Sequence, residues 1–159
     1  MGSVKEKTKD VILYFLRRVG GQVDGKKKLM KLMFLVEHFD PERRVLVEKP
    51  RLGNQFLIYY YGVFSFEVAE CYEELVREGR VAGWPPTVTS QEGEAALDEG
   101  LKRVVDRVVE EFGGLTGYEL EVETLKMLGI EPYEKDMFFG KEVRGIIKRR
   151  TRPRRLLKV

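Results

Sequence analysis

The spacing of apolar residues constrains the fold of this chain more than any other sequence feature. They recur at helical intervals from Val4 to Val19, which predicts a helix that Gly20-Gly21 ends. The same spacing runs from Lys26 to Phe39, where Asp40-Pro41 ends a second predicted helix. Because this pattern continues through much of the chain, a mainly helical fold is expected.

Capping residues locate the remaining helices. Ser65 is a good N-cap, with Glu67 in the first turn. Ser90 is expected to cap a long helix, and Thr116 with Glu119 forms the pattern of a capping box. Together with glycine stops, these residues predict helices over Ser65–Gly79, Ser90–Phe112, Thr116–Gly129 and about Phe139–Arg149.

Three other segments are typical of β-structure. Val45–Val47 is a short candidate strand, and Gln55–Tyr61 is apolar and aromatic enough for a buried strand or extended segment. Arg80–Thr89 has two extended pieces around a Gly-Trp-Pro-Pro turn, which predicts a β-hairpin. We therefore expect a mainly α (α+β) fold with one domain over residues 1–149 and a basic, mobile arm over 150–159.

The apolar stripes of these helices predict a common core. Its expected members are Leu29, Leu32, Met33, Val36, Tyr72, Leu75, Val76, Leu97, Leu101 and Val104.

The composition limits the function. One cysteine, Cys71, excludes an internal disulfide and a multi-cysteine metal site, and one histidine, His38, excludes His-rich zinc sites. No apolar run approaches the roughly 20 residues that span a bilayer. We expect a cytoplasmic protein with no metal, cofactor or catalytic centre. Charged residues make up 35% of the chain and Asn54 is the only asparagine, a pattern typical of hyperthermophiles.

The predicted helix before the hairpin ends in a distinctive stretch. Leu75–Val81 (LVREGRV) is followed by Thr87–Thr89, which leads into Ser90. This order resembles winged-helix regulators, whose recognition helix ends in a leucine-acidic-glycine-branched stretch before a wing hairpin. Gly79 permits the left-handed turn off the helix. The resemblance implies a winged-helix-like unit with additional flanking helices. The alternative is a helix followed by an unrelated hairpin.

A wider resemblance covers residues 10–97. Gly25–Leu35 (GKKKLMKLMFL) resembles the K-L-x-K-L-x-x-L helix of the Panacea (SocA-like) domain and of related, uncharacterised YwgA-like proteins. Tyr60–Ser65 (YYGVFS) resembles their Y-G-P-F-S turn, with Val63 in place of the usual proline, and Met30 stands where glutamine is common in the helix. In Panacea proteins the resemblance implies an antitoxin or adaptor that neutralises a partner protein.

The charge of the helix over Ser65–Gly79 argues against DNA reading. Opposite its apolar face it carries five glutamates and one arginine, namely Glu67, Glu70, Glu73, Glu74, Glu78 and Arg77. Phosphates would repel such a face, whereas DNA-reading helices offer cations and amides. A solvated acidic surface is the simpler interpretation. A docking surface for a partner, made by Glu67, Glu70, Glu74 and Arg77, is the functional one.

Basic residues concentrate at the end of the chain. From Lys141 onward there are nine Lys or Arg and one acid, Glu142, a net charge of +8. The candidates for phosphate contacts are Lys148, Arg149, Arg150, Arg152, Arg154, Arg155 and Lys158. An arm that folds onto the acidic body or another subunit is an equal alternative. Lys26–Lys28 is interpreted as a solvated helix start.

The remaining chemistry-bearing residues have structural interpretations. Tyr59–Tyr61, Phe56 and Phe64 are expected in core and hairpin packing, with an aromatic ligand slot as the alternative. Cys71 is expected near an exposed flank of its acidic helix and unreactive, and His38 as a helix-end cation or packed ring. The leading hypothesis is a non-enzymatic protein-interaction or regulatory domain with an unidentified partner, a homodimer included. The alternative is a DNA-binding regulator that uses the wing and the basic tail.

Overall fold

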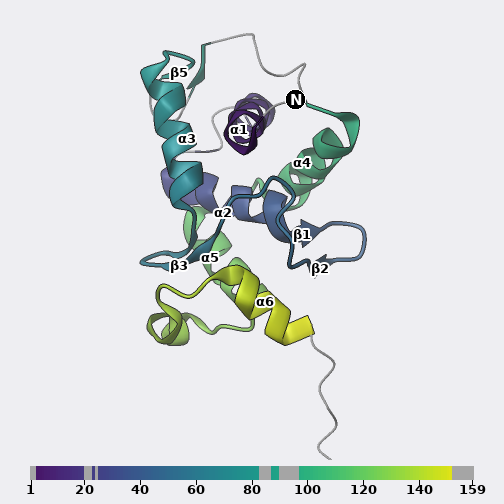
Figure 1. The fold of residues 1–159 in the computed structure, drawn as a ribbon, viewed down its shortest axis with the longest axis vertical. Coiled ribbons are helices and arrows are strands. Elements are labelled where there is room, and N and C mark those ends of the chain that lie inside the picture. Colours follow the sequence, from purple (N-terminus) through teal and green to yellow (C-terminus); the bar gives the residue numbers. More distant parts are fainter. Residues whose placement is uncertain (1–2, 20–22, 24, 83–86, 90–96, 152–159) are drawn as a thin grey trace, which may run out of the picture.

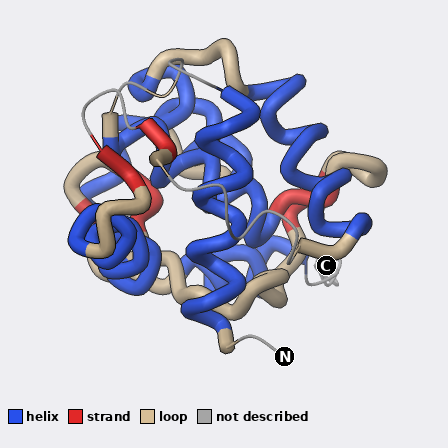
Figure 2. Tube along the Cα trace, turned by 90° about the horizontal axis from the view of Figure 1, so that it is seen from above, coloured by secondary structure: helices blue, strands red, loops and turns tan. Residues whose placement is uncertain are grey.

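The fold is mainly helical, as predicted, with small antiparallel two-stranded sheets (Figures 1 and 2). The computed structural model describes residues 3–19, 23, 25–82, 87–89 and 97–151. The helices are α1 (Val4–Val19), α2 (Lys26–His38), α3 (Phe66–Arg77), α4 (Glu99–Phe112), α5 (Gly117–Met127), the 3₁₀ helix η3 (Pro132–Phe138) and α6 (Val143–Thr151). The strands pair as β1 (Phe39–Asp40) with β2 (Val45–Leu46), β3 (Leu57–Tyr59) with β4 (Gly62–Phe64), and β5 (Val81–Ala82) with β6 (Thr87–Val88).

Helix α2 forms the centre of the core. Every residue from Lys28 to His38 is buried. In Figure 1, α1, α3 and α4 lie above α2, and α5 and α6 lie below it. Helices α3, α4 and α5 contact α2 directly, and α1 packs against α3 and α4. A helix enclosed on all sides needs apolar residues around its whole circumference, which Met30, Phe34 and Leu35 supply outside the predicted stripe.

The predicted order of helix and hairpin is confirmed for α3 and β5–β6. The Ser65 hydroxyl accepts a hydrogen bond from the Val68 amide at 3.2 Å and caps α3. Gly79 has φ +71°, the left-handed conformation expected after the helix. Val81 then pairs with Val88 and Ala82 with Thr87. The winged-helix assignment itself remains a proposal, because many folds place a hairpin after a helix.

Several predicted boundaries are wrong. The extended segment Gln55–Tyr61 reverses after Tyr59, and the chain returns as β4. Helix α4 begins at Glu99, with the Asp98 carboxylate accepting from the Leu101 amide, whereas Ser90 lies outside the described residues. The last helix covers Val143–Thr151 rather than Phe139–Arg149, so Arg150 belongs to α6 and not to a separate arm.

The predicted core is largely confirmed. Val76 is the exception, because it is 44% exposed on α3. Leu101 and Val104 are partly buried and pack against the core. In the described part of the chain, no helix is both long and apolar enough to cross a membrane.

Candidate functional site

The β3–β4 hairpin presents two tyrosines at its tip. Tyr59 pairs with Gly62, so Tyr60 and Tyr61 form the turn, and each is 64% exposed. Gly62 closes the turn with φ +92°. A Cβ at this position would also lie 3.3 Å from Cγ of Glu121, so the positive φ favours glycine and a larger residue would in addition have to displace this side chain slightly. Of the aromatic residues predicted in core and hairpin packing, Phe56 is buried, whereas Tyr60 and Tyr61 lie on the hairpin and outside the core.

The hairpin is held on both edges. Beside β3, the segment before α6 pairs with it: the Gly140 amide donates to Ile58, the Ile58 amide to Lys141, and the Val143 amide to Phe56. The opposite strand, β4, contacts α2 and α5. The tip therefore projects from a base that is bonded on one side and packed on the other.

Aromatic rings surround the hairpin. Tyr59 stacks on Phe64 and on Phe139, with ring centroids 5.2 Å apart in both pairs, and meets Phe66 edge-on at 5.3 Å. Tyr60 lies 5.1 Å from the ring of Phe139. Phe66 and Phe139 are themselves 53% and 44% exposed. We call the exposed residues Tyr60, Tyr61, Phe66 and Phe139 the hairpin patch.

A pocket of about 380 Å³ lies beside the patch, between the hairpin, α2 and α3. Its apolar lining comes from Leu29, Met30, Val68, Ala69 and Tyr72, and from Tyr59–Tyr61 and Phe64 of the hairpin. Its charged lining residues are Lys26, Lys27, Lys31 and Glu73. We call it the hairpin pocket. It is lined by four of the five aromatic residues for which the sequence left a ligand slot as the alternative; the fifth, Phe56, does not line it.

The two lysines of the K-L-x-K-L-x-x-L stretch are buried. Lys28 donates to the carbonyl of Gly113 at 2.6 Å, so its interpretation as a solvated helix start is wrong. Lys31, 1% exposed, donates to the carbonyl of Val63 at 3.1 Å. Burial lowers the pKa of Lys31 to about 7, although Glu121 opposes this effect. A lysine with this pKa is partly neutral near pH 7.

Two lysines contact the carboxylate of Glu121. Its two carboxylate oxygens accept from Lys27 at 2.7 Å and from Lys135 at 3.0 Å. Burial opposes the ionisation of Glu121, but these hydrogen bonds outweigh it and lower its pKa. Lys27 also lies over the rings of Tyr61 and Tyr118, at 5.1 and 5.7 Å from their centroids, which links this cluster to the hairpin tip.

Met30 also has a polar contact at this site. Its sulfur accepts a hydrogen bond from the Ser65 amide at 3.4 Å. A thioether is only a weak acceptor, but here it satisfies a buried amide at the start of α3.

Most of the acidic face of α3 is occupied by partners within the chain. Lys5 of α1 contacts Glu70 at 3.3 Å and Glu74 at 2.7 Å, and Lys9 contacts Glu74 at 2.7 Å and Glu78 at 2.8 Å. Hydrogen bonds from Lys5 and Lys9 lower the pKa of Glu74 to about 2. These glutamates therefore attach α3 to α1.

The other two residues of that predicted docking surface differ from each other. Glu67 accepts from the Gln55 amide at 3.0 Å and from the Ser65 hydroxyl at 3.1 Å, so it holds the start of α3. Arg77 is exposed in the last turn of α3. The four residues thus do not form one free charged surface.

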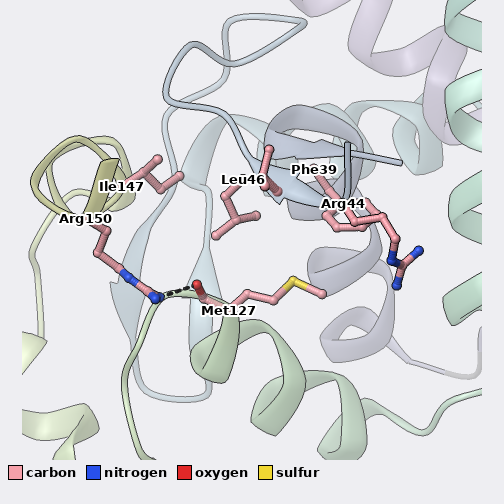
Figure 3. Close-up of a pocket in the computed structure, with 7 residues that line it drawn as sticks. Phe39, Arg44, Leu46, Met127, Ile147 and Arg150 are labelled. Carbon is pink, nitrogen blue, oxygen red and sulfur yellow. Dashed lines mark hydrogen bonds between the residues drawn. The ribbon is translucent and has the colours of Figure 1, made fainter. Parts of the chain in front are cut away.

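The predicted basic residues are only partly described. Lys148, Arg149 and Arg150 lie exposed at the end of α6, whereas Arg152, Arg154, Arg155 and Lys158 are outside the described residues. Arg150 donates to the Met127 carbonyl at the end of α5 (Figure 3). At least one of the three described cations is therefore engaged within the chain.

Figure 3 shows a second pocket, of about 300 Å³, between the β1–β2 hairpin, the end of α5 and α6. Phe39, Leu46 and Ile147 supply apolar surface, and Arg44 and Arg150 are its charged residues. Both guanidinium groups are engaged, because Arg44 binds Glu111 through two nitrogens and Arg150 binds Met127. Among the described residues that line this pocket, no charged group is therefore left free to bind a ligand, and the hairpin pocket is the better candidate site.

Cys71 and His38 are both packed inside the fold. Cys71 is buried rather than near an exposed flank, and burial raises the pKa of its thiol to about 11. His38 is a packed ring between Phe34 and Phe56, with Nδ1 2.9 Å from the Val47 carbonyl oxygen. Burial lowers the pKa of His38.

Among the described residues, no three His, Cys, Asp or Glu side chains are grouped as metal ligands. In comparisons with known proteins, the chain matches no protein-family model, no curated protein and no solved structure.

Proposed function

We propose that this chain is a cytoplasmic, non-enzymatic protein-interaction domain that binds a partner protein through the hairpin patch. The observation that carries the proposal is the gathering of Tyr60, Tyr61, Phe66 and Phe139, all large and 44–64% exposed, around one hairpin. Contiguous exposed apolar surface is uncommon on monomers and marks interaction sites. Tyrosine in particular is enriched among residues that dominate binding energy.

The packing of the patch suits it to binding. Phe139 stacks on Tyr59 and contacts Tyr60, and the main chain after Phe139 is hydrogen-bonded to β3. Side chains that are already ordered lose little conformational entropy when a partner binds. A preorganised aromatic surface can therefore give useful affinity from a small area.

The sequence resemblance points in the same direction. The stretch Tyr60–Ser65 that resembles the Panacea and YwgA-like turn includes the hairpin tip, and the lysine-containing helix beside it lines the hairpin pocket. If the resemblance extends to function, the partner is a protein that this domain neutralises or adapts. The proposal needs only that the partner contacts this surface.

Removing the aromatic tip should strongly weaken partner capture. We expect the double variant Tyr60→Ser, Tyr61→Ser, tagged and expressed in the native host, to retain the partner at least about tenfold less than the unmodified protein, because hot-spot aromatics each contribute about 2 kcal/mol or more. Quantitative mass spectrometry of the captured proteins measures this loss.

The matched control is Val76→Ser, which removes an exposed apolar side chain from α3 outside the patch. It should capture the same protein as the unmodified chain. Equal capture by all three proteins would contradict the proposal. If the captured protein is another copy of this chain, the patch mediates formation of a homodimer.

The second candidate function is DNA binding by α6 and the basic tail, favoured by the exposed cations Lys148 and Arg149. Helix α3 still presents Glu67, Glu70 and Glu73 outward, which phosphates would repel. If duplex DNA binds at all, affinity should therefore reside in the tail.

Truncation after Thr151 tests this candidate, because it removes Arg152, Arg154, Arg155 and Lys158 and leaves α6 intact. For each phosphate that the shortened chain no longer neutralises, the slope of log affinity against log salt should fall by about 0.9 in magnitude. Fluorescence anisotropy with a duplex at several salt concentrations measures the slope. An unchanged slope would exclude the tail as the binding element, and no binding by the intact chain at low salt would remove this candidate.

A further inference from the structure

We propose that the hairpin pocket binds a small apolar carboxylate, such as an aromatic acid, whose anionic group lies against Lys31. This goes beyond the proposed function, because the ligand is a small molecule and the deciding residue lies in α2 outside the hairpin patch. The inference rests on the hydrogen bonding of Lys31, on the charge around it and on the apolar lining of the pocket.

Lys31 has fewer acceptors than it has protons to donate. An ammonium group has three N–H donors, and among the described residues the Val63 carbonyl is the one acceptor bonded to it. Lys31 is only 1% exposed to solvent, and it lines the pocket. A buried charged donor without acceptors is costly, so a ligand that supplies an acceptor oxygen here would be stabilised.

The charges around Lys31 favour an anion. Glu121 is the acid whose charge raises the pKa of Lys31. Both carboxylate oxygens of Glu121 already accept hydrogen bonds, from Lys27 and Lys135. The carboxylate of Glu121 is therefore already paired with two other lysines, and Glu73 is the one acid among the described residues that line the pocket. A ligand carboxylate would balance this excess of positive charge, whereas a cation or a second amine would add to it.

The rest of the pocket fits an apolar ring. Leu29, Met30 and Tyr72 line it together with the aromatic side chains of the hairpin, and the volume of about 380 Å³ falls in the range of roughly 300–1,000 Å³ that is usual for small-molecule sites. Mostly apolar walls with a few polar groups are the usual form of such sites, in which the polar groups fix the ligand's orientation.

Two probes of matched shape test the assignment. Naphthalene-2-carboxylate and naphthalene-2-carboxamide, titrated into the protein at pH 6.5 and followed by calorimetry or NMR, differ in charge but hardly in apolar area. The unmodified protein should bind the carboxylate at least about tenfold more tightly, because charge-assisted hydrogen bonds are about twice as strong as neutral ones.

Lys31→Met should remove this preference and leave the affinity for the carboxamide unchanged. The control is Lys28→Met, which removes another buried lysine of α2 that does not line the pocket and should keep the preference. The assignment would be overturned if the unmodified protein bound neither probe, bound both equally, or kept its preference after Lys31→Met.

A measurement on the unmodified protein covers the case in which Lys31→Met does not fold. The groups that act on Lys31 are Glu121, Lys27 and Lys135, and the lowered pKa of Glu121 keeps it ionised at neutral and alkaline pH. The carboxylate needs the charged form of Lys31, so its affinity should fall as pH rises from 6 to 9 through the pKa of about 7. Carboxamide affinity should not change. A carboxylate affinity that is flat over this range would overturn the assignment.

Discussion

Replacing Glu37 with alanine should lower the free energy of unfolding by about 4 kcal/mol, since each buried amide left without an acceptor costs about 1–3 kcal/mol. The Glu37 side chain is fully buried in α2. Its carboxylate accepts from the amides of Leu52 at 2.6 Å, Gly53 at 3.3 Å and Asn54 at 2.9 Å. Asn54 in turn donates to the Thr8 hydroxyl of α1 at 2.7 Å. Glu37 therefore connects α2, the loop before β3 and α1.

Urea denaturation with a two-state fit measures this loss. Glu37→Gln should lose less stability, because the glutamine side chain keeps one acceptor oxygen. Glu110→Ala is the control, since it removes an exposed carboxylate from α4 and should change stability by no more than about 0.5 kcal/mol. A loss below about 1 kcal/mol for Glu37→Ala would show that the loop does not depend on this carboxylate.

Adjacent substitutions on α3 should differ sharply in their effect. Leu75 is fully buried, so Leu75→Ala should cost about 2–5 kcal/mol of stability. Val76 is 44% exposed, so Val76→Ala should cost less than about 1 kcal/mol. The same denaturation experiment measures both. Similar losses in the two variants would mean that α3 is rotated relative to the structure described.

Local sequence signals predict the elements that they directly determine. Ser65 and Thr116 cap α3 and α5 as their positions indicate, and Glu119 completes the capping box of α5. Gly79 adopts the left-handed conformation between α3 and its hairpin. Each of these features depends on a few neighbouring residues, so the sequence shows it without knowledge of the tertiary fold.

The pairing of β3 with β4 is not predicted from the local sequence, because the turn between them lacks the usual sequence signal. Two-residue turns are recognised by pairs such as Asn-Gly, whereas here two tyrosines form the tip and glycine follows them. In the sequence Gly62 indicates a break in a strand, whereas in the fold it closes the turn. The aromatic content of the segment suggests burial, and the exposure of Tyr60 and Tyr61 is evident only from the fold.

The starts of α4 and α6 are predicted incorrectly for a related reason. Ser90 and Asp98 are both acceptable N-caps, and only the structure identifies Asp98 as the cap of α4. None of the residues of Pro132–Phe138 is buried. Its 3₁₀ helix therefore has no core-facing apolar stripe that could mark it in the sequence.

Part of the candidate site cannot be predicted from the sequence, because its lysines do not follow the usual preference of lysine for the surface. Lysine is rarely buried, so the sequence favours a solvated helix start for Lys28 and gives Lys31 no chemical role. Their burial depends on carbonyl groups of Gly113 and Val63, which lie 85 and 32 residues away in sequence. The acidic face of α3 is similarly misleading, because Lys5 and Lys9 of α1 neutralise much of it. Such contacts cannot be read from one segment alone.

Site-specific photocross-linking in the native host tests the proposed interaction most directly. The photoreactive residue benzoylphenylalanine would replace Tyr60 or Tyr61 in the patch and, as controls, the exposed Val45 or Val76 elsewhere. On irradiation, positions 60 and 61 should give a covalent adduct with the same partner protein, identified by mass spectrometry, and positions 45 and 76 should not. No adduct at positions 60 and 61, or the same adduct at all four, would contradict the proposal that this domain binds its partner through the hairpin patch.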